Sequence, residues 1–263
     1  MMKDLAEFPG SARAPGRELQ GFIVALPGEA RAVAGRGWIR RQGRTFKRRL
    51  QDGHEQLWLQ CGVGPERAAE GARWLLDQGA ESLCLFGVSG GLDPRLESGD
   101  LVVAEAVCDE NGNRYPTTVA EWAANRNGVH LGSILTLHAP VLGPKEKQQA
   151  FRRFGALAVD MESVAVARAA LEAGRSCRIL RAICDPARRT LAKDAFALID
   201  GRGRLRVGTL LVSLMRRPRL LADLFSMQQD FSRALKALGR VAPTIIEGIR
   251  DSGPEKARTN DNV

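Results

Sequence analysis

Aromatic side chains are scarce in this chain of 263 residues, where they make up 5% of the sequence and include one tyrosine. Single-stranded nucleic acids bind to platforms of stacked aromatic rings, so this scarcity argues against a protein of that kind. No apolar run approaches the ~18–20 residues that a membrane-spanning helix needs. Residues 1–20 are polar and rich in proline and glycine, unlike a signal peptide. We therefore expect no nucleic-acid partner, no membrane span and no secretion signal.

Patterns that bind metals are also missing. The five cysteines form no CxxC pair and no Cys/His cluster, so we expect no zinc or other metal, and no cofactor. Three of the cysteines lie in apolar runs, where a cysteine behaves as a small hydrophobic residue. An odd number of such thiols indicates a reducing, cytoplasmic compartment.

What the chain does have is positive charge, with a net charge of +9 and a pI of about 9.9. This balance suits anionic lipid, nucleic acid or a phosphorylated ligand, and it equally suits a solvated, arginine-rich surface. The hydrophobic share of 44% and the charged share of 26% are ordinary for a soluble globular protein. A chain of this length can bury a large core.

Short apolar runs alternate with helical patterns, which indicates an α/β fold around a mixed, largely parallel sheet. The expected strands are 21–26, 57–63, 82–86, 101–107, 131–137, 156–159 and 177–183. Helices are expected at 65–78 and from 163 to about 173, and a basic strand or hairpin at 36–49. The predicted organisation is a flexible tail at 1–20, a catalytic domain at 21–200, a basic amphipathic helical extension at 201–250 and a flexible tail at 251–263.

The last third of the chain differs in character from the rest. Arginines flank an apolar run at 207–215, and leucines and phenylalanines then recur at helical spacing between 220 and 238. We expect two helices that pack on the domain or at a subunit interface. A basic amphipathic surface that contacts a membrane is the alternative.

Three carboxylates directly follow apolar strands, namely Glu29, Glu162 and Asp185. Ligands of open α/β sheets bind beyond the carboxyl ends of the strands. Taken singly, each acid has an ordinary explanation, because Glu29 and Glu162 suit a helix N-terminus and Asp185 suits a turn before proline. The glycine-rich run at 87–91 is either a tight turn or a backbone cradle for ribose or phosphate, although it has neither Walker nor GxGxxG spacing.

Six segments favour the functional interpretation of these residues over the ordinary structural one, because they occur in the order typical of one superfamily. They are FIVALPGEARAV (22–33), GVGPERAAEGARWLL (62–76), GVSGGLDPRLESGDLVV (87–103), LGSILT (131–136), AVDMESVAVA (158–167) and RAICDPA (181–187). Over roughly residues 21–195 the chain resembles the purine nucleoside phosphorylase and methylthioadenosine/adenosylhomocysteine nucleosidase superfamily. The resemblance implies a three-layer α/β/α fold and no metal or cofactor.

Within that superfamily the sequence is most similar to the hopanoid-associated branch, which acts on adenosylhopane. The features that carry this likeness are the GVSGG form of the glycine-rich loop, the Asp-Met-Glu-Ser motif and the arginine- and leucine-rich segment at 214–224.

The resemblance also implies roles for particular residues. Asp185 corresponds to the acid that protonates or hydrogen-bonds N7 of the leaving purine, and Glu29 to the carboxylate that positions an attacking water. Glu162 corresponds to the glutamate that holds the ribose hydroxyls, and Met161 to a methionine packed against the sugar. Arg181 matches an arginine that contacts the substrate-binding residues rather than the substrate itself. The loop residues expected to contact the substrate are Val88, Ser89 and Gly90.

Departures from the family pattern leave the acceptor open. Val88 replaces the usual loop serine and Ser89 is displaced by one residue, while Leu85 stands where hexameric phosphorylases carry a phosphate-binding arginine. The turn at 27–28 with Arg31 nevertheless resembles the phosphate loop of those enzymes. Water and phosphate therefore both remain as acceptors, the latter as a co-substrate.

Cleavage of an N-glycosidic bond passes through an oxocarbenium-like sugar, and a purine leaves readily only when it is protonated or strongly hydrogen-bonded. The resemblance implies adenine release from adenosylhopane in hopanoid biosynthesis, by a cytoplasmic homo-oligomer that contacts the inner membrane face. The alternatives are a methylthioadenosine/adenosylhomocysteine nucleosidase or a general purine nucleoside phosphorylase and, more remotely, a non-catalytic basic binding module.

Overall fold

The computed structural model describes residues 18–51, 54–119, 123, 126–190 and 220–251. In this part, ten strands form one mixed sheet. They are β1 (Leu19–Val24), β2 (Ile39–Arg41), β3 (Arg44–Gln51), β4 (His54–Gln60), β5 (Ser82–Gly91), β6 (Leu101–Cys108), β7 (Arg114–Pro116), β8 (Val129–Thr136), β9 (Ala158–Asp160) and β10 (Ser176–Asp185). The helices are α1 (Pro27–Ala34), α2 (Pro65–Asp77), α3 (Pro144–Phe154), α4 (Ser163–Glu172) and α7 (Leu220–Asp251).

The sheet has a parallel centre. β1 pairs in parallel with β4 and β5, and β5 pairs in parallel with β10. β6, β8 and β9 form a second parallel set, which antiparallel pairings join to β10 at one side and to β5 at the other. Strands β5, β10, β6, β8 and β9 therefore close into a ring of pairings. The carboxyl ends of β1, β4, β5 and β10 lie at the same edge of the sheet.

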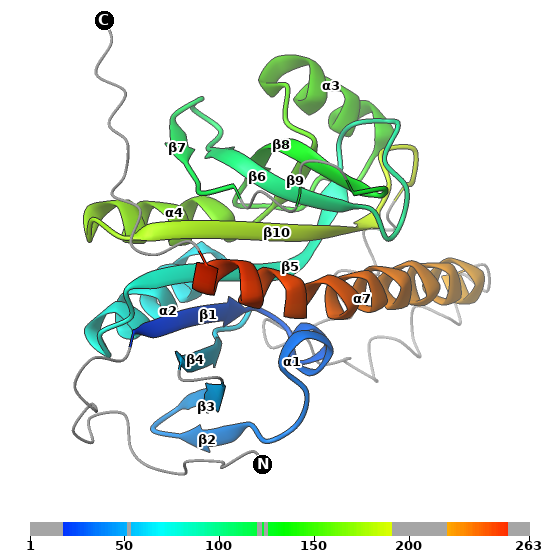
Figure 1. Ribbon diagram of the computed structural model, residues 1–263. Helices are drawn as coiled ribbons and strands as arrows, with labels where there is room; N and C mark the ends of the chain where they lie inside the picture. The colour runs from blue at the N-terminus through cyan, green and yellow to red at the C-terminus, as the bar shows by residue number, and fades with distance from the viewer. Residues whose placement is uncertain (1–17, 52–53, 120–122, 124–125, 191–219, 252–263) are drawn as a thin grey trace, which may run out of the picture.

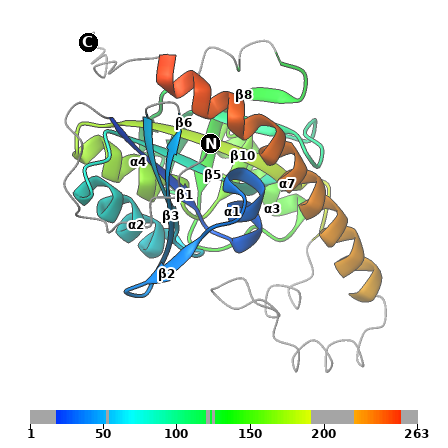
Figure 2. The same cartoon turned by 60° about the horizontal axis from the view of Figure 1, so that its bottom comes forward.

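The sheet is covered on both faces, which explains why its central strands are apolar throughout rather than alternating. α2 and α4 pack on one face in a core that includes Leu75, Leu85, Val166 and Ile179. α1 and α7 cover the other face, where Phe22 stacks on Trp58 with a ring-centroid distance of 4.2 Å. Figures 1 and 2 show these helices on opposite sides of the central strands. The predicted three-layer α/β/α fold is confirmed.

Helix α7 is a single helix of 32 residues that contains Pro243. It is the second of the two expected C-terminal helices, and the first, at 207–215, lies outside the described residues. Its buried positions Ala234, Leu238, Ala242 and Ile245 recur at helical spacing and belong to the same core as α1 and β1. Within the described chain, α7 thus shares one core with α1 and β1.

Two contacts fix α7 against the rest of the domain. At Gly239, α7 lies so close to α1 that a Cβ atom on this residue would be 2.9 Å from the carbonyl oxygen of Ala32. Asp230 forms an ion pair with Arg189, which follows β10. α7 therefore touches both the helix after β1 and the loop after β10.

Other sequence expectations hold with small shifts. The basic segment forms the antiparallel hairpin of β2 and β3, and the expected helix at 65–78 is α2. β1 begins at Leu19, within the segment 1–20 that the sequence predicted as a tail, and residues 1–17 lie outside the described chain. Among the described residues no helix combines the length and apolar character needed to cross a membrane.

Candidate active site

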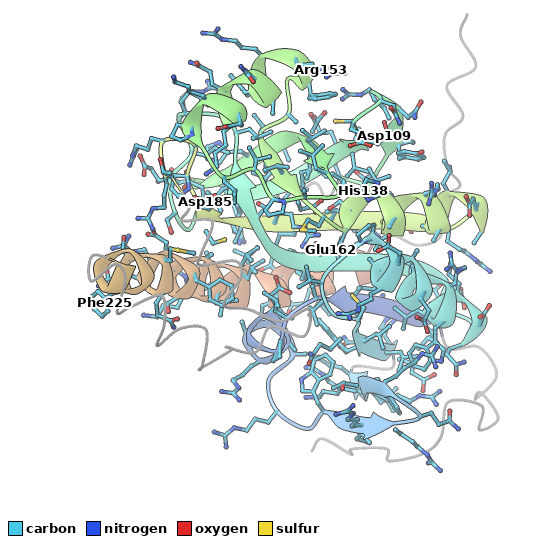
Figure 3. The ribbon with its side chains drawn as sticks, turned by 180° about the vertical axis from the view of Figure 1, so that it is seen from behind. Asp109, His138, Arg153, Glu162, Asp185 and Phe225 are labelled. Carbon is cyan, nitrogen blue, oxygen red and sulfur yellow. The ribbon has the colours of Figure 1, made fainter. Side chains whose placement is uncertain are left out.

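The elements that end at the carboxyl edge of the sheet bring the predicted site residues together. β1 leads into α1 and Glu29, and β5 ends in the glycine-rich run at 87–91. β9 leads to Glu162 at the start of α4, while β10 carries Arg181 and Asp185. Figure 3 shows Glu162 at the start of α4 and Asp185 at the end of β10.

Glu29 is the third residue of α1 and is 1% exposed. Its Oε2 accepts hydrogen bonds from the backbone N–H groups of Ala25, at 2.9 Å, and Leu26, at 2.8 Å. Its Oε1 accepts one from the N–H of Val88 in β5, at 2.9 Å. Burial raises the pKa of Glu29 above its usual value, against the opposing effects of Arg181 and these N–H groups. The buried carboxyl therefore joins α1 to β5.

Arg181 lies at the centre of a group of acids and is 0% exposed. Its Nη2 is 2.5 Å from Oδ2 of Asp160 and 3.2 Å from Oε2 of Glu162. The other oxygen of Glu162 accepts the backbone N–H of Gly64 at 2.9 Å. The pKa of Glu162 is raised to about 7, chiefly by burial; Asp160 and Glu29 contribute to this rise, whereas Arg181 and the N–H of Gly64 oppose it. We call Glu29, Asp160, Glu162 and Arg181 the acid–arginine cluster.

Gly87 shows how tightly this cluster packs against β5. A Cβ atom at position 87 would overlap Nη1 of Arg181 and lie 3.0 Å from Oε1 of Glu29. The guanidinium therefore occupies the space that any larger residue would need, and places Arg181 between the two glutamates. This explains the glycine of the GVSGG run by close approach rather than by turn geometry.

Asp160 is a member of the cluster that the sequence analysis missed. Its Oδ1 accepts hydrogen bonds from the hydroxyl of Thr136 at 2.8 Å and from the backbone N–H of Ser163 at 3.2 Å. It opens the Asp-Met-Glu-Ser motif, which was the available signal. Met161 is half-buried between Asp160 and Glu162.

Asp185 lies at the end of β10 beside a second residue that the sequence analysis missed. Its Oδ2 is 2.6 Å from Nζ of Lys147 in α3. Burial raises the pKa of Asp185 to about 6, and the ammonium of Lys147 opposes this rise. Burial lowers the pKa of Lys147. Because burial raises the pKa of Asp185 at the same time, the difference between the pKa values of the two groups is reduced. No sequence signal separates Lys147 from its neighbour Lys145.

The glycine-rich run connects the two acid sites. Val88 is half-buried and donates its N–H to Glu29. Ser89 is buried, and its Oγ has no hydrogen-bond partner in the structure. A Cβ atom at Gly90 would lie 3.6 Å from Oδ2 of Asp185, so the strand runs directly beside that carboxyl. All eight predicted site residues thus lie at the carboxyl edge of one sheet.

Within the part of the chain that the structure describes, no group of three or more histidine, cysteine, aspartate or glutamate side chains could hold a metal ion. The cysteines are free thiols, and burial raises the pKa of Cys184 to about 12, with Asp185 and Glu29 adding to the rise.

A covered α/β sheet with buried acids at the carboxyl edge of its parallel strands is typical of an α/β protein that binds a ligand at that edge. The family model described as the Phosphorylase superfamily matches residues 20–215, and the chain belongs to this family. The sequence-based assignment to a superfamily of nucleosidases and nucleoside phosphorylases is thereby confirmed. No curated protein sequence matches the chain.

Several solved structures share the fold. The 5′-methylthioadenosine/S-adenosyl homocysteine nucleosidase of Helicobacter pylori has 17% identity and a TM-score of 0.68, over 88% of this chain and 99% of that one. The S-adenosylhomocysteine nucleosidase of Streptococcus pyogenes, solved with 5-methylthiotubericidin, has 20% identity and a TM-score of 0.69, over 90% and 99%. The futalosine hydrolase of Helicobacter pylori has 17% identity and a TM-score of 0.67, over 88% and 97%.

Proposed function

We propose that this protein hydrolyses the N-glycosidic bond of a purine nucleoside. The observation that carries the proposal is the placement of three buried acids, Glu29, Glu162 and Asp185, at one sheet edge with three different sets of partners. In the proposed reaction Asp185 protonates the departing purine at N7. Glu162 holds the ribose hydroxyls, and Met161 packs against the sugar. The loop residues that line the substrate are Val88, Ser89 and Gly90.

The reaction needs this division of labour. As the bond to the base breaks, the sugar gains positive charge and the base gains negative charge. The excess of carboxylates around Arg181 favours the sugar's charge, because fixed charges in a dry site act strongly. A carboxyl with a raised pKa beside the base supplies the proton, and such acid catalysis contributes ~10²–10⁴-fold. Glu29 orients the attacking water, and Arg181 positions both glutamates.

Water is favoured over phosphate by the surroundings of Glu29. The N–H groups of Ala25, Leu26 and Val88 point at this carboxyl and so are not available to an incoming anion. A phosphate beside a buried carboxylate would be repelled unless extra cations compensated. Leu85 provides none where hexameric phosphorylases have an arginine. Phosphorolysis, with phosphate as co-substrate, remains the alternative.

For the substrate we propose adenosylhopane, with adenine as the released base, as the branch resemblance implies. α7 supports a lipid-linked substrate, because Phe225 is 67% exposed and lies at the outer end of this helix (Figure 3). The exposed Arg233, Lys236 and Arg240 recur along its outward face. An apolar tip with basic neighbours suits peripheral contact with anionic lipid. The alternatives are a 5′-methylthioadenosine or adenosylhomocysteine nucleosidase, as in the structures above, and a non-catalytic basic module.

The deciding measurement is adenine release from adenosylhopane in liposomes, beside methylthioadenosine and adenosine, with and without phosphate. We expect release from the lipid-linked nucleoside without phosphate. Release from the small nucleosides alone would keep the proposed chemistry and reject the lipid substrate. A requirement for phosphate would replace hydrolysis by phosphorolysis. A folded protein that releases no base from any of them would favour the binding module.

Membrane contact has its own test. Phe225→Ser combined with Lys236→Gln should reduce sedimentation with liposomes that contain anionic lipid, because it removes an apolar anchor and a surface charge. The matched control is Glu110→Gln together with Arg114→Gln, both exposed and far from α7 in sequence. Equal sedimentation of all three proteins would remove the membrane proposal. Size-exclusion chromatography with light scattering tests the proposed homo-oligomer.

A further inference from the structure

Helix α3 buries a lysine where an amphipathic helix normally buries an apolar residue. Among its 11 residues, all described, Lys147 alone is fully buried, at 0% exposure. The phenylalanines of the same helix, Phe151 and Phe154, are only half-buried against the sheet. Lysine is almost never fully buried unless it is paired. The position of Lys147 therefore indicates a specific partner.

All partners of this ammonium lie in one segment, residues 185–189. Nζ is 2.6 Å from Oδ2 of Asp185 and donates to the carbonyl oxygens of Pro186, at 3.0 Å, and Arg189, at 3.3 Å. It is also 3.4 Å from the carbonyl oxygen of Asp185. An ammonium has three N–H donors, so this segment satisfies it completely. Lys147 thus fixes the position of residues 185–189, which include Asp185.

The pairing leaves one oxygen of the acid without a partner. Oδ2 of Asp185 is occupied by Lys147, while Oδ1 is buried and has no hydrogen-bond partner in the structure. A buried polar atom without a partner in the protein is rare and needs an explanation, and a catalytic role is one of those known. Oδ1 is therefore the oxygen available to a bound base.

We propose that Lys147 is a positioning residue for the reaction, fixing Asp185 so that Oδ1 faces the leaving purine and stabilising the carboxylate that remains. This proposal rests on the function proposed above. As the bond between C1′ and N9 breaks, its electron pair goes to the purine and the proton of Asp185 goes to N7. Asp185 is then a carboxylate paired with the ammonium of Lys147, which keeps its protons. Water adds to C1′ and gives one proton to Glu29. Glu29 then releases this proton to solvent and Asp185 takes one up from solvent, which restores both side chains.

The charged groups around Asp185 set the expected pH response. Lys147 and Arg189 lower the pKa of its carboxyl, Asp230 of α7 raises it, and burial raises it most. Cys184 also adjoins this group, with its thiol neutral because its pKa is about 12. Removing the ammonium should therefore raise the pKa of Asp185 above about 6. Since the protonated acid is the active form, the high-pH limb of the rate profile should move to higher pH.

The test compares Lys147→Met and Lys147→Arg with Lys145→Met, an exposed lysine of the same helix. One readout is kcat and KM for nucleoside cleavage across pH. The other is a carbon-13 NMR titration of labelled aspartate carboxyls, in which the Asp185 signal is assigned by its loss in Asp185→Asn. Circular dichroism confirms that each variant is folded, and the NMR titration does not depend on turnover.

We expect Lys147→Met to lower kcat by on the order of 10²-fold with a smaller change in KM, since misplacing a reacting group costs about that much. The Asp185 titration and the high-pH limb should both rise by about one unit or more, and Lys147→Arg should restore them in part. An unchanged Asp185 titration in folded Lys147→Met would overturn the proposal. If the titration shifts but the wild type cleaves no nucleoside, the pairing is supported and the proposed function fails.

Discussion

The two ends of the candidate site use charge in opposite ways. In the acid–arginine cluster one cation, Arg181, faces three acids, Asp160, Glu162 and Glu29. At the other end, one cation, Lys147, faces one acid, Asp185. The first end has more acids than cations, whereas Lys147 and Asp185 at the second form a one-to-one pair. A site that must stabilise a cation at one end and transfer a proton at the other benefits from this inequality.

The ends also differ in how completely their polar atoms are paired. Both oxygens of Glu29 and both of Glu162 have hydrogen-bond partners. At the other end, Oδ1 of Asp185 and Oγ of Ser89 are buried and have none. We infer that the acid–arginine cluster is preorganised, whereas the Asp185 end is completed by the ligand.

The largest effect is expected from Asp185→Asn, which removes the transferable proton and keeps the side chain's shape. Base release should fall by ~10²–10⁴-fold, as for the loss of a general acid. The measurement is kcat/KM for the nucleoside that the wild type cleaves best. Asp109→Asn, an aspartate of the turn after β6, serves as the control and should keep full activity. Retained activity in Asp185→Asn would remove the proposed contrast between the ends.

Arg181→Met should have the next largest effect, and on folding rather than on chemistry alone. It leaves the buried Asp160 and Glu162 without their cation, and breaking a buried ion pair costs ~3–5 kcal/mol. Urea unfolding at neutral pH measures the loss. Arg175→Met, which changes an exposed arginine on the approach to the same strand, should leave the free energy of unfolding nearly unchanged. Equal stability of the two variants would contradict the assigned network.

Glu162→Gln should change how the free energy of unfolding depends on pH. The folded protein raises the pKa of Glu162 from 4.5 to about 7, so the folded state binds this proton more tightly than the unfolded state. The associated stability is present below pH 4.5 and is lost as the pH rises towards 7. Relative to Glu162→Gln, the wild type should lose roughly 1–3 kcal/mol over this range. Parallel unfolding curves at all pH values would argue against this pKa.

Ser89→Ala should have the smallest effect on the free protein. Because Oγ has no partner, its removal should leave the free energy of unfolding within about 0.5 kcal/mol or raise it slightly. If the hydroxyl contacts the substrate, KM should rise by up to ~10-fold, the value of one hydrogen bond. Thermal unfolding and steady-state kinetics separate the two effects. A marked loss of stability would show that Ser89 has a structural partner in the free protein.

The sequence was most informative for site residues that lie beside an apolar strand and within a recognisable motif. Glu29, Glu162, Arg181 and Asp185 each stand beside an apolar strand in a motif of the superfamily, so their convergence could be predicted. Lys147 could not, because its segment, PKEKQQ, is typical of a solvated helix and its burial depends on how α3 docks on the 185–189 loop.

The packing of α7 shows the same limit of local reasoning. The sequence predicted a helical extension over 201–250, and α7 runs from Leu220 to Asp251 through Pro243. Packing on the domain was expected as one alternative and a subunit interface as the other, but the sequence did not indicate that α7 would share a core with β1 and α1. Shared burial is a property of two segments far apart in the chain, so neither segment reveals it alone.

The contact of α7 with α1 joins a late segment of the chain to an early one. At synthesis rates of ~5–20 residues per second, Gly239 follows Ala32 by roughly 10–40 s. Once Asp185 has been made, the growing polypeptide carries Glu29 and Glu162 as well, but one apolar face of its sheet still lacks the cover of α7. We expect the nascent chain to need protection from aggregation, and a premature stop codon before α7 to yield insoluble protein rather than a slower enzyme.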